Sequence, residues 1–149
     1  MVTTVGNEGD IKGLVRDLIL LERDAIAAYD STIEKLSDPA LSQQVATFRQ
    51  DHLQHLDVLN EIAAETGAEA PLEGDMKQYL TTGKIALADL IGDGAILKAM
   101  KTNEDDTVTA YERAAGHADA IEKSREFFAK ALADERRHRT WMEETAAAL

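Results

Sequence analysis

The chain has no cysteine among its 149 residues, and it has only two prolines. The absence of cysteine excludes disulfide bonds, thiolate catalysis and metal sites built on sulfur ligands. Because disulfides mark oxidising compartments, a chain without cysteine is expected to be cytoplasmic. The scarcity of proline leaves long stretches without the residue that breaks helices most strongly.

Long apolar runs and clustered basic residues are also missing. No segment approaches the ~18 consecutive apolar residues that mark a membrane-spanning helix. The first ten residues, MVTTVGNEGD, lack the basic and apolar regions of a secretory signal. The formal net charge is −12. Phosphate groups are bound by clustered Lys and Arg, so neither nucleic acid nor an anionic membrane is an expected partner.

What the chain does have is helical periodicity, and between its glycine and proline clusters no stretch alternates as a strand does. The length of 149 residues and the hydrophobic content of 44% predict one domain, residues 1–149, with a real core. Asp38 is expected to cap a helix with Pro39 in its first turn, and Asp93 to cap a later one. Long helices are predicted over about residues 10–36, 39–66, 93–116 and 119–147, with a shorter helix over about 76–91.

These lengths and connections predict an all-α, antiparallel four-helix bundle. The first and third connections between the long helices are short, which makes each half of the chain an antiparallel hairpin. The second connection is long and contains the predicted short helix, so it can cross over along the bundle from one hairpin to the other.

Each long helix carries polar side chains at mid-length on its apolar face, where Leu or Ile is expected. All of them are carboxylates or imidazoles, which are the natural ligands of many metal ions. These residues are Glu22, His52, His55, Glu104, Glu135 and His138.

The polar positions also repeat between the two halves of the chain. The Glu–Tyr pair at positions 22 and 29 recurs at positions 104 and 111, and the polar pair at 52 and 55 recurs at 135 and 138. The two hairpins therefore resemble duplicated halves, and their polar side chains are expected to meet around a pseudo-twofold axis.

The cost of burial favours a metal at that meeting point. An ionised carboxylate buried without a partner costs several kcal/mol even after relaxation. Three of them would offset much of the ~5–15 kcal/mol by which a domain is stable. Metal cations remove this conflict. The alternative is a metal-free core network, in which protonated carboxyls, neutral imidazoles and tyrosines satisfy one another.

One Glu from each of two helices and a Glu-x-x-His motif from the others form the pattern of the ferritin-like di-iron carboxylate proteins. The chain resembles this superfamily from its first long helix to its last. The spacing from Glu22 to Tyr29, and from Glu104 to Tyr111, is similar to that of bacterioferritins and rubrerythrins. The short crossover helix and the segment GDGAILKAMKTNEDDTVTAYERA resemble an uncharacterised bacterial family of small ferritin-like four-helix proteins.

The resemblance implies a role for each matching residue. Glu22 and Glu104 would each bind one metal ion, Glu135 would bridge the two ions, and His55 and His138 would bind one ion each. The metal implied is iron, most simply a di-iron pair, and Mn or Zn would suit the same ligands.

Tyr29 and Tyr111 would take part in the chemistry of the site by hydrogen-bonding to the carboxylates and orienting them.

His52 departs from the pattern, because the family usually has a second bridging glutamate there. A neutral histidine offers one lone pair to one metal. Asp51 is the neighbouring carboxylate, but it lies about 100° around the helix from His52. We therefore expect His52 to be a direct ligand and Asp51 to be a supporting or substitute ligand. An asymmetric dinuclear site, a single metal, and zinc in place of iron all stay open.

Two functions of different classes follow from the resemblance. The first is a non-haem oxidoreductase with ferroxidase- or peroxidase-like chemistry, which would use dioxygen or peroxide and Fe(II) as substrates. The second is a metal-binding or stress-related bundle without turnover. A metal-free interaction module is a third possibility.

The chain stops just after its last helix, so a homodimer is expected rather than a ferritin cage. The remaining histidine, His117, is expected at the surface or at a helix end.

Overall fold

The computed structural model describes residues 3–68, 87 and 89–149. Within these residues the chain forms four helices and no strand, which confirms the predicted all-α fold. The helices are α1 (Ile11–Lys35), α2 (Pro39–Thr66), α4 (Asp93–Ala115) and α5 (Glu122–Ala148). Apart from residues 87 and 89–91, the short helix predicted over 76–91 lies outside the described residues.

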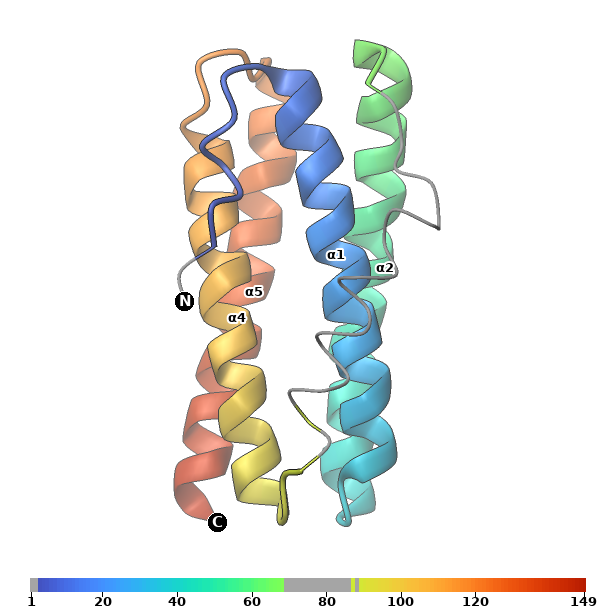
Figure 1. Ribbon diagram of the computed structural model, residues 1–149, viewed down its shortest axis with the longest axis vertical. Coiled ribbons are helices and arrows are strands. Elements are labelled where there is room, and N and C mark those ends of the chain that lie inside the picture. Colours follow the sequence, from blue (N-terminus) through green and yellow to red (C-terminus); the bar gives the residue numbers. More distant parts are fainter. Residues whose placement is uncertain (1–2, 69–86, 88) are drawn as a thin grey trace.

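The four helices form a bundle in which α1 packs against α2 and α4, and α5 packs against the same two helices (Figure 1). Neighbouring helices run in opposite directions. As a result, α2 ends at the opposite end of the bundle from the start of α4 (Figure 1). This arrangement agrees with the predicted pair of hairpins and the long second connection. None of the described helices is long and apolar enough to cross a membrane.

Short-range hydrogen bonds from a capping side chain are found at the starts of α1 and α2, but not at the start of α4. As predicted, Asp38 caps α2, because its side chain accepts a hydrogen bond of 2.9 Å from the Ala40 amide. Asp93 does not cap α4; it is the first helical residue, and Gly92 occupies the N-cap position. The Asp93 carboxylate instead accepts hydrogen bonds of 2.8 Å and 3.1 Å from the amides of Ser37 and Asp38. It therefore ties the connection between α1 and α2 to the start of α4.

The last helix begins at Glu122, three residues later than predicted. The chain turns first, because the His117 ring accepts a hydrogen bond from the Asp119 amide and the His117 carbonyl accepts one from Ala120. His117 lies at a helix end, as one of its two expected placements had it, because it directly follows Gly116, the C-cap residue of α4. It is not at the surface: only 9% of it is exposed, and its Nε2 lies 2.7 Å from the Glu8 carbonyl oxygen. It fastens the segment before α1 to the α4–α5 turn.

The apolar core lies in two clusters along the bundle. One cluster, which includes Leu14, Leu18 and Leu59, joins the start of α1 to the end of α2. The other, which includes Phe48, Leu97 and Met142, joins the start of α2 and of α4 to the end of α5. The six predicted polar residues belong to neither cluster and lie at mid-length of their helices, so water is excluded from them on both sides along the bundle axis.

Candidate metal centre

All six polar residues converge inside the bundle, although they come from four different helices. Each side chain is buried, with no residue more than 1% exposed. The pattern placed them on the apolar faces of their helices, and the structure brings them together at one point. The residues are Glu22 on α1, His52 and His55 on α2, Glu104 on α4, and Glu135 and His138 on α5.

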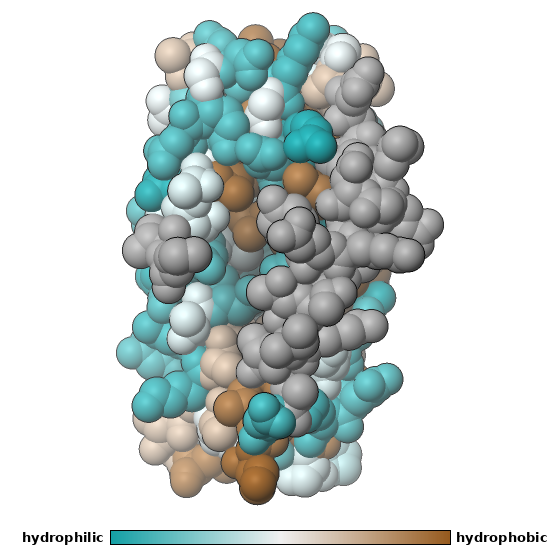
Figure 2. Space-filling model, in the orientation of Figure 1, coloured by the Kyte–Doolittle hydropathy of each residue, from teal (hydrophilic) through white to brown (hydrophobic). Residues whose placement is uncertain are grey.

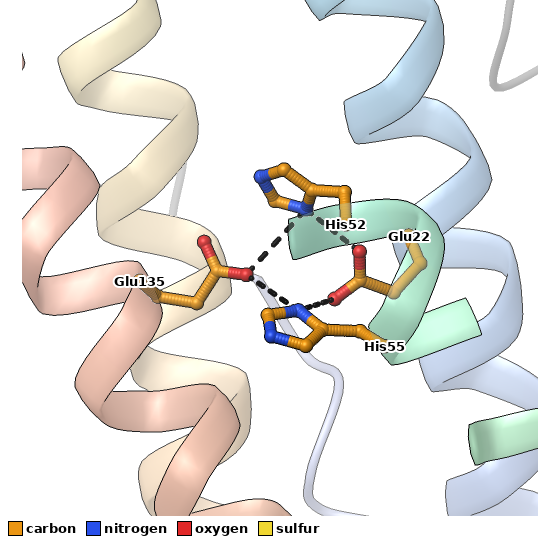
Figure 3. Close-up of side chains that lie close together, drawn as sticks. All are labelled: Glu22, His52, His55 and Glu135. Atoms are coloured by element: carbon orange, nitrogen blue, oxygen red, sulfur yellow. Dashed lines mark hydrogen bonds and ion pairs between the residues drawn. The ribbon is translucent and has the colours of Figure 1, made fainter. Parts of the chain in front are cut away.

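Four of these side chains form a first donor set, in which the ring and carboxylate atoms point toward one another (Figure 3). The Glu22 carboxylate lies 2.7 Å from His52 Nδ1 and 3.2 Å from His55 Nδ1. On the other side, Glu135 Oε1 lies 3.5 Å from His52 Nδ1 and 3.2 Å from His55 Nδ1. Two nitrogens and two oxygens thus surround one position.

A second donor set shares two members with the first. It consists of His52, Glu104, Glu135 and His138, and its donor atoms, like those of the first set, all lie within 4.8 Å of one another. His52 Nε2 is 3.6 Å from Glu104 Oε1, and Glu135 Oε2 is 3.4 Å from His138 Nδ1. His52 and Glu135 therefore stand between two adjacent positions, each surrounded by carboxylate and imidazole groups.

The two tyrosines hydrogen-bond to carboxylates of the opposite hairpin. The Tyr111 hydroxyl on α4 donates a hydrogen bond of 2.6 Å to Glu22 Oε1 on α1, and the Tyr29 hydroxyl on α1 donates to Glu104 Oε1 on α4. These two hydrogen bonds are equivalent under the pseudo-twofold repeat of the sequence. Each one holds an oxygen of the carboxylate and so orients the carboxylate group.

Two of the histidines, His55 and His138, are each hydrogen-bonded through their outer ring nitrogen to an aspartate. His55 Nε2 donates a hydrogen bond of 2.8 Å to Asp134 Oδ2, and His138 Nε2 donates one of 2.8 Å to Asp51 Oδ2. This contact directs each Nδ1 toward the centre, as second-layer carboxylates do in metal sites. Arg137 Nη2 lies 2.8 Å from Asp51 and 3.2 Å from Asp134, and so joins the two pairs.

Of these two aspartates, the sequence pattern identified only Asp51. Asp51 was expected as a supporting or substitute ligand, and its bond to His138 makes it a supporting group. Asp134 was missed. The repeat contained the signal, because Asp134 precedes Glu135 as Asp51 precedes His52.

Thr107 was also missed, and it breaks the symmetry of the centre. Its hydroxyl lies 2.9 Å from Glu104 Oε2 and 3.1 Å from Glu135 Oε2. The matching position in the first half is Ala25, which has no polar group. A threonine within a helix carries no sequence signal of such a contact, because its role appears only when α4 and α5 are packed together.

Three donor atoms of the centre are buried without a hydrogen-bond partner: His52 Nε2, Glu135 Oε1 and His138 Nδ1. A buried polar atom left unsatisfied costs about 1–3 kcal/mol. All three atoms belong to the two donor sets, and imidazole nitrogen and carboxylate oxygen are ligands that Fe, Zn and Mn accept. The donor chemistry of the centre therefore fits a divalent metal ion at either position.

The side chains of the first donor set also attract protons. Burial alone would raise the pKa of Glu22 and of Glu135, but the positive rings of His52 and His55 hold both pKa values below the usual range. Burial would lower the pKa of His55, but Asp134, Glu135 and Glu22 raise it to about 11. The pKa of His52 is raised in the same way by Glu135 and Glu22. Protons and metal ions thus compete for the ring nitrogens of His52 and His55.

Glu104 differs from the other two carboxylates. Burial, and then the negative charge of Glu135, raise its pKa to about 7. Near neutral pH it is the carboxyl of the centre that takes up a proton most readily.

The stability of the metal-free protein is expected to fall as the pH is raised from about 6.5 to 9. The pKa of His55 is raised from 6.5 to about 11, so its stabilising contribution is complete below pH 6.5 and is lost as the pH rises toward 11. The raised pKa values of His52 and Glu104 act in the same direction. Melting temperatures of chelator-treated and zinc-loaded protein at both pH values measure the effect. The loaded protein should lose less stability, because zinc replaces the protons; equal slopes would contradict the assignment.

The fold and the centre together define an all-α four-helix bundle with a buried cluster of glutamate and histidine side chains at mid-length. The chain belongs to the family described as a domain of unknown function (DUF2383), which matches residues 12–117. This range takes in α2, α4 and all of α1 except its first residue, and it ends before α5, which carries Glu135 and His138. A comparison with curated proteins finds no match. The family is one of unknown function, which agrees with the expectation of an uncharacterised family.

Proposed function

We propose that the protein is a ferritin-like metalloprotein that binds two metal ions, most simply iron, and uses them to reduce dioxygen or peroxide. One observation carries the proposal: two buried donor sets of carboxylates and imidazoles share Glu135, and three of their donor atoms lack any other partner. Such a centre is costly without cations.

Each residue has a definite place in this proposal. Glu22 and His55 would hold the first ion, and Glu104 and His138 would hold the second. Glu135 would serve both ions, because its Oε1 faces the first donor set and its Oε2 faces His138 of the second. All of these groups are prepositioned by packing within four helices, so little rearrangement is needed on binding.

The chain's own residues control the chemistry around the ions. Bound iron would supply two electrons, one from each Fe(II) as it becomes Fe(III). With two protons from solvent, these electrons would reduce hydrogen peroxide to two water molecules, or dioxygen to hydrogen peroxide. Tyr29 and Tyr111 hold the hydroxyl protons nearest to the carboxylates, and burial raises both pKa values well above 10, so the hydroxyls stay protonated. The two apolar clusters exclude bulk water from the centre.

A second candidate function is metal binding without turnover, in which the ions stabilise the bundle. It is favoured by His52, which stands where related di-iron proteins are expected to have a second bridging carboxylate. Nearly complete burial of the six residues also favours it, because a reacting molecule needs a path to the ions.

Anaerobic addition of Fe(II) to metal-free protein, followed by air, separates the candidates. Oxidation is expected to produce a fast rise in near-ultraviolet ferric absorbance and oxygen uptake that depends on the protein. Stable binding without rate enhancement supports the structural candidate. If Fe, Mn and Zn are not retained and leave the melting temperature unchanged, the metal proposal fails, because a ligand that binds the native state must stabilise it.

His52→Glu is expected to raise the rate of Fe(II) oxidation, because a carboxylate can bind both ions through two oxygens. The rate and the metal content are measured together. Gln54→Glu is the matched control, since it adds the same charge at an exposed position of α2. If His52→Glu leaves both the rate and the metal content as they are in the wild type, His52 is not a ligand.

A further inference from the structure

His52 lies between the two donor sets, with one ring nitrogen near carboxylates of each. Its Nδ1 is 2.7 Å from Glu22 Oε2 and 3.5 Å from Glu135 Oε1, whereas its Nε2 is 3.6 Å from Glu104 Oε1. The ring is completely buried and packs against Tyr29, with 4.6 Å between ring centroids. Packing therefore fixes the ring so that its Nδ1 faces the first donor set and its Nε2 faces Glu104 of the second.

The other two histidines of the centre differ from His52 in their outer nitrogens. The Nε2 atoms of His55 and His138 are both occupied by aspartates, at 2.8 Å in each case. Each of these rings has one nitrogen left for a metal ion. His52 has no such aspartate, and its Nε2 is one of the buried atoms without a partner.

The repeat adds an independent argument. His52 and Glu135 occupy equivalent positions in the two halves of the chain, and they are the two residues shared by both donor sets. Glu135 presents its two oxygens to different histidines, Oε1 to His55 and Oε2 to His138. The equivalent residue on α2 presents two nitrogens.

We infer that His52 binds both metal ions at once, through Nδ1 to the ion held by Glu22 and His55 and through Nε2 to the ion held by Glu104 and His138. This inference rests on the proposed function. The ring of metal-free His52 is positive and carries a proton on each nitrogen, so binding through both nitrogens requires loss of both protons. One proton leaves to solvent water as each ion binds. The resulting imidazolate is an anion between two cations, and it takes the place of a second bridging carboxylate.

The ligand class follows from this arrangement. Each position then offers two nitrogens and two carboxylate oxygens, a set that suits divalent ions with affinity for imidazole, such as Zn, Cu and Fe, rather than Mg or Ca. Structural zinc sites are four-coordinate and redox-inactive, so Zn²⁺ is a suitable probe that does not depend on turnover.

Two substitutions of His52 test its two ring nitrogens one at a time. In His52→Asn the side-chain oxygen reaches the place of Nδ1, and in His52→Gln it reaches the place of Nε2. Wild-type protein is expected to bind two Zn²⁺ per chain, and each variant one. His52→Asn should keep the ion near His55, and His52→Gln should keep the ion near His138. Elemental analysis gives the count, and anomalous diffraction from zinc-loaded crystals gives the positions. His55→Ala and His138→Ala are the reference variants for loss of the first and of the second ion.

A crystal structure of zinc-loaded wild-type protein is a second test, which does not depend on whether the variants fold. Coordination of both His52 nitrogens, each at about 2.0–2.1 Å from a zinc ion, supports the inference. Two ions retained by either variant, or a wild-type structure with only one His52 nitrogen coordinated, overturns it while leaving metal binding intact. Wild-type protein that retains no zinc, iron or manganese overturns the proposed function itself, so the two failures are distinguishable.

Discussion

Glu135→Gln is expected to remove both metal ions from the protein. Glu135 is shared by the two donor sets, and its Oε1 has no hydrogen-bond partner. The amide keeps the volume of the side chain but has no charge and only one acceptor oxygen, so it cannot serve two cations. Metal content per chain should fall from two to none. The stabilisation by metal, about 2.7–4.1 kcal/mol at 100–1,000 times the dissociation constant, should disappear with it.

The same substitution should also destabilise the metal-free protein. Removing one partner of a buried ion pair costs about 3–5 kcal/mol, because the remaining charge stays buried without compensation. Here the positive charges of His52 and His55 lose a neighbour at 3.5 Å and 3.2 Å. Glu144→Gln makes the same chemical change at an exposed position of α5 and should alter neither metal content nor melting temperature. Two ions retained by Glu135→Gln would show that Glu135 is not a ligand.

Asp134→Asn is expected to weaken metal binding at the first position by about 10–100-fold, which is typical for loss of a group that orients a ligating histidine. Asp134 accepts the Nε2 proton of His55 at 2.8 Å and so directs Nδ1 toward the centre. Asp51→Asn should have the corresponding effect on the second position through His138. Competition with a chelator of known affinity measures each loss separately.

Lys130→Met provides the control for Asp134. Lys130 is exposed and pairs with the same carboxylate at 2.9 Å, but it does not touch the histidine. Its removal should change zinc affinity little, because an exposed ion pair contributes ~1 kcal/mol or less. If Lys130→Met and Asp134→Asn weaken binding equally, the effect comes from surface charge and not from the orientation of His55.

The hydrogen bonds across the pseudo-twofold axis explain how a bundle tolerates so many polar groups in its interior. Glu22 and Glu104 each accept a hydrogen bond from a tyrosine of the opposite hairpin. Two of the three histidines of the centre donate one to an aspartate of the opposite hairpin. The supporting bonds therefore cross between halves that repeat in sequence. Because both hairpins must pack before these bonds form, the centre exists only in the assembled bundle.

Helical periodicity alone predicted much of this protein. Apolar residues at spacings of three and four define one face of a helix, so polar residues at mid-length of that face, such as Glu22 and Glu104, had to enter the core. Short connections between helices require antiparallel neighbours, which made the bundle predictable as well. Asp38 followed by Pro39 identified a helix start, because capping depends on residues only a few positions apart.

Contacts between residues far apart in the sequence could be identified only from the packed structure. Spacing assigns a residue to a face, but it does not say which atom of the side chain points at which neighbour. It therefore missed the contact of Thr107 with Glu135. It placed His117 at the surface or at a helix end, and it could not show that the ring is buried, because the partner, Glu8, lies more than a hundred residues away. Periodicity identified the residues of the centre, whereas side-chain packing across the four helices decided that Nδ1 of His55 and of His138 faces inward and that both nitrogens of His52 face donor sets.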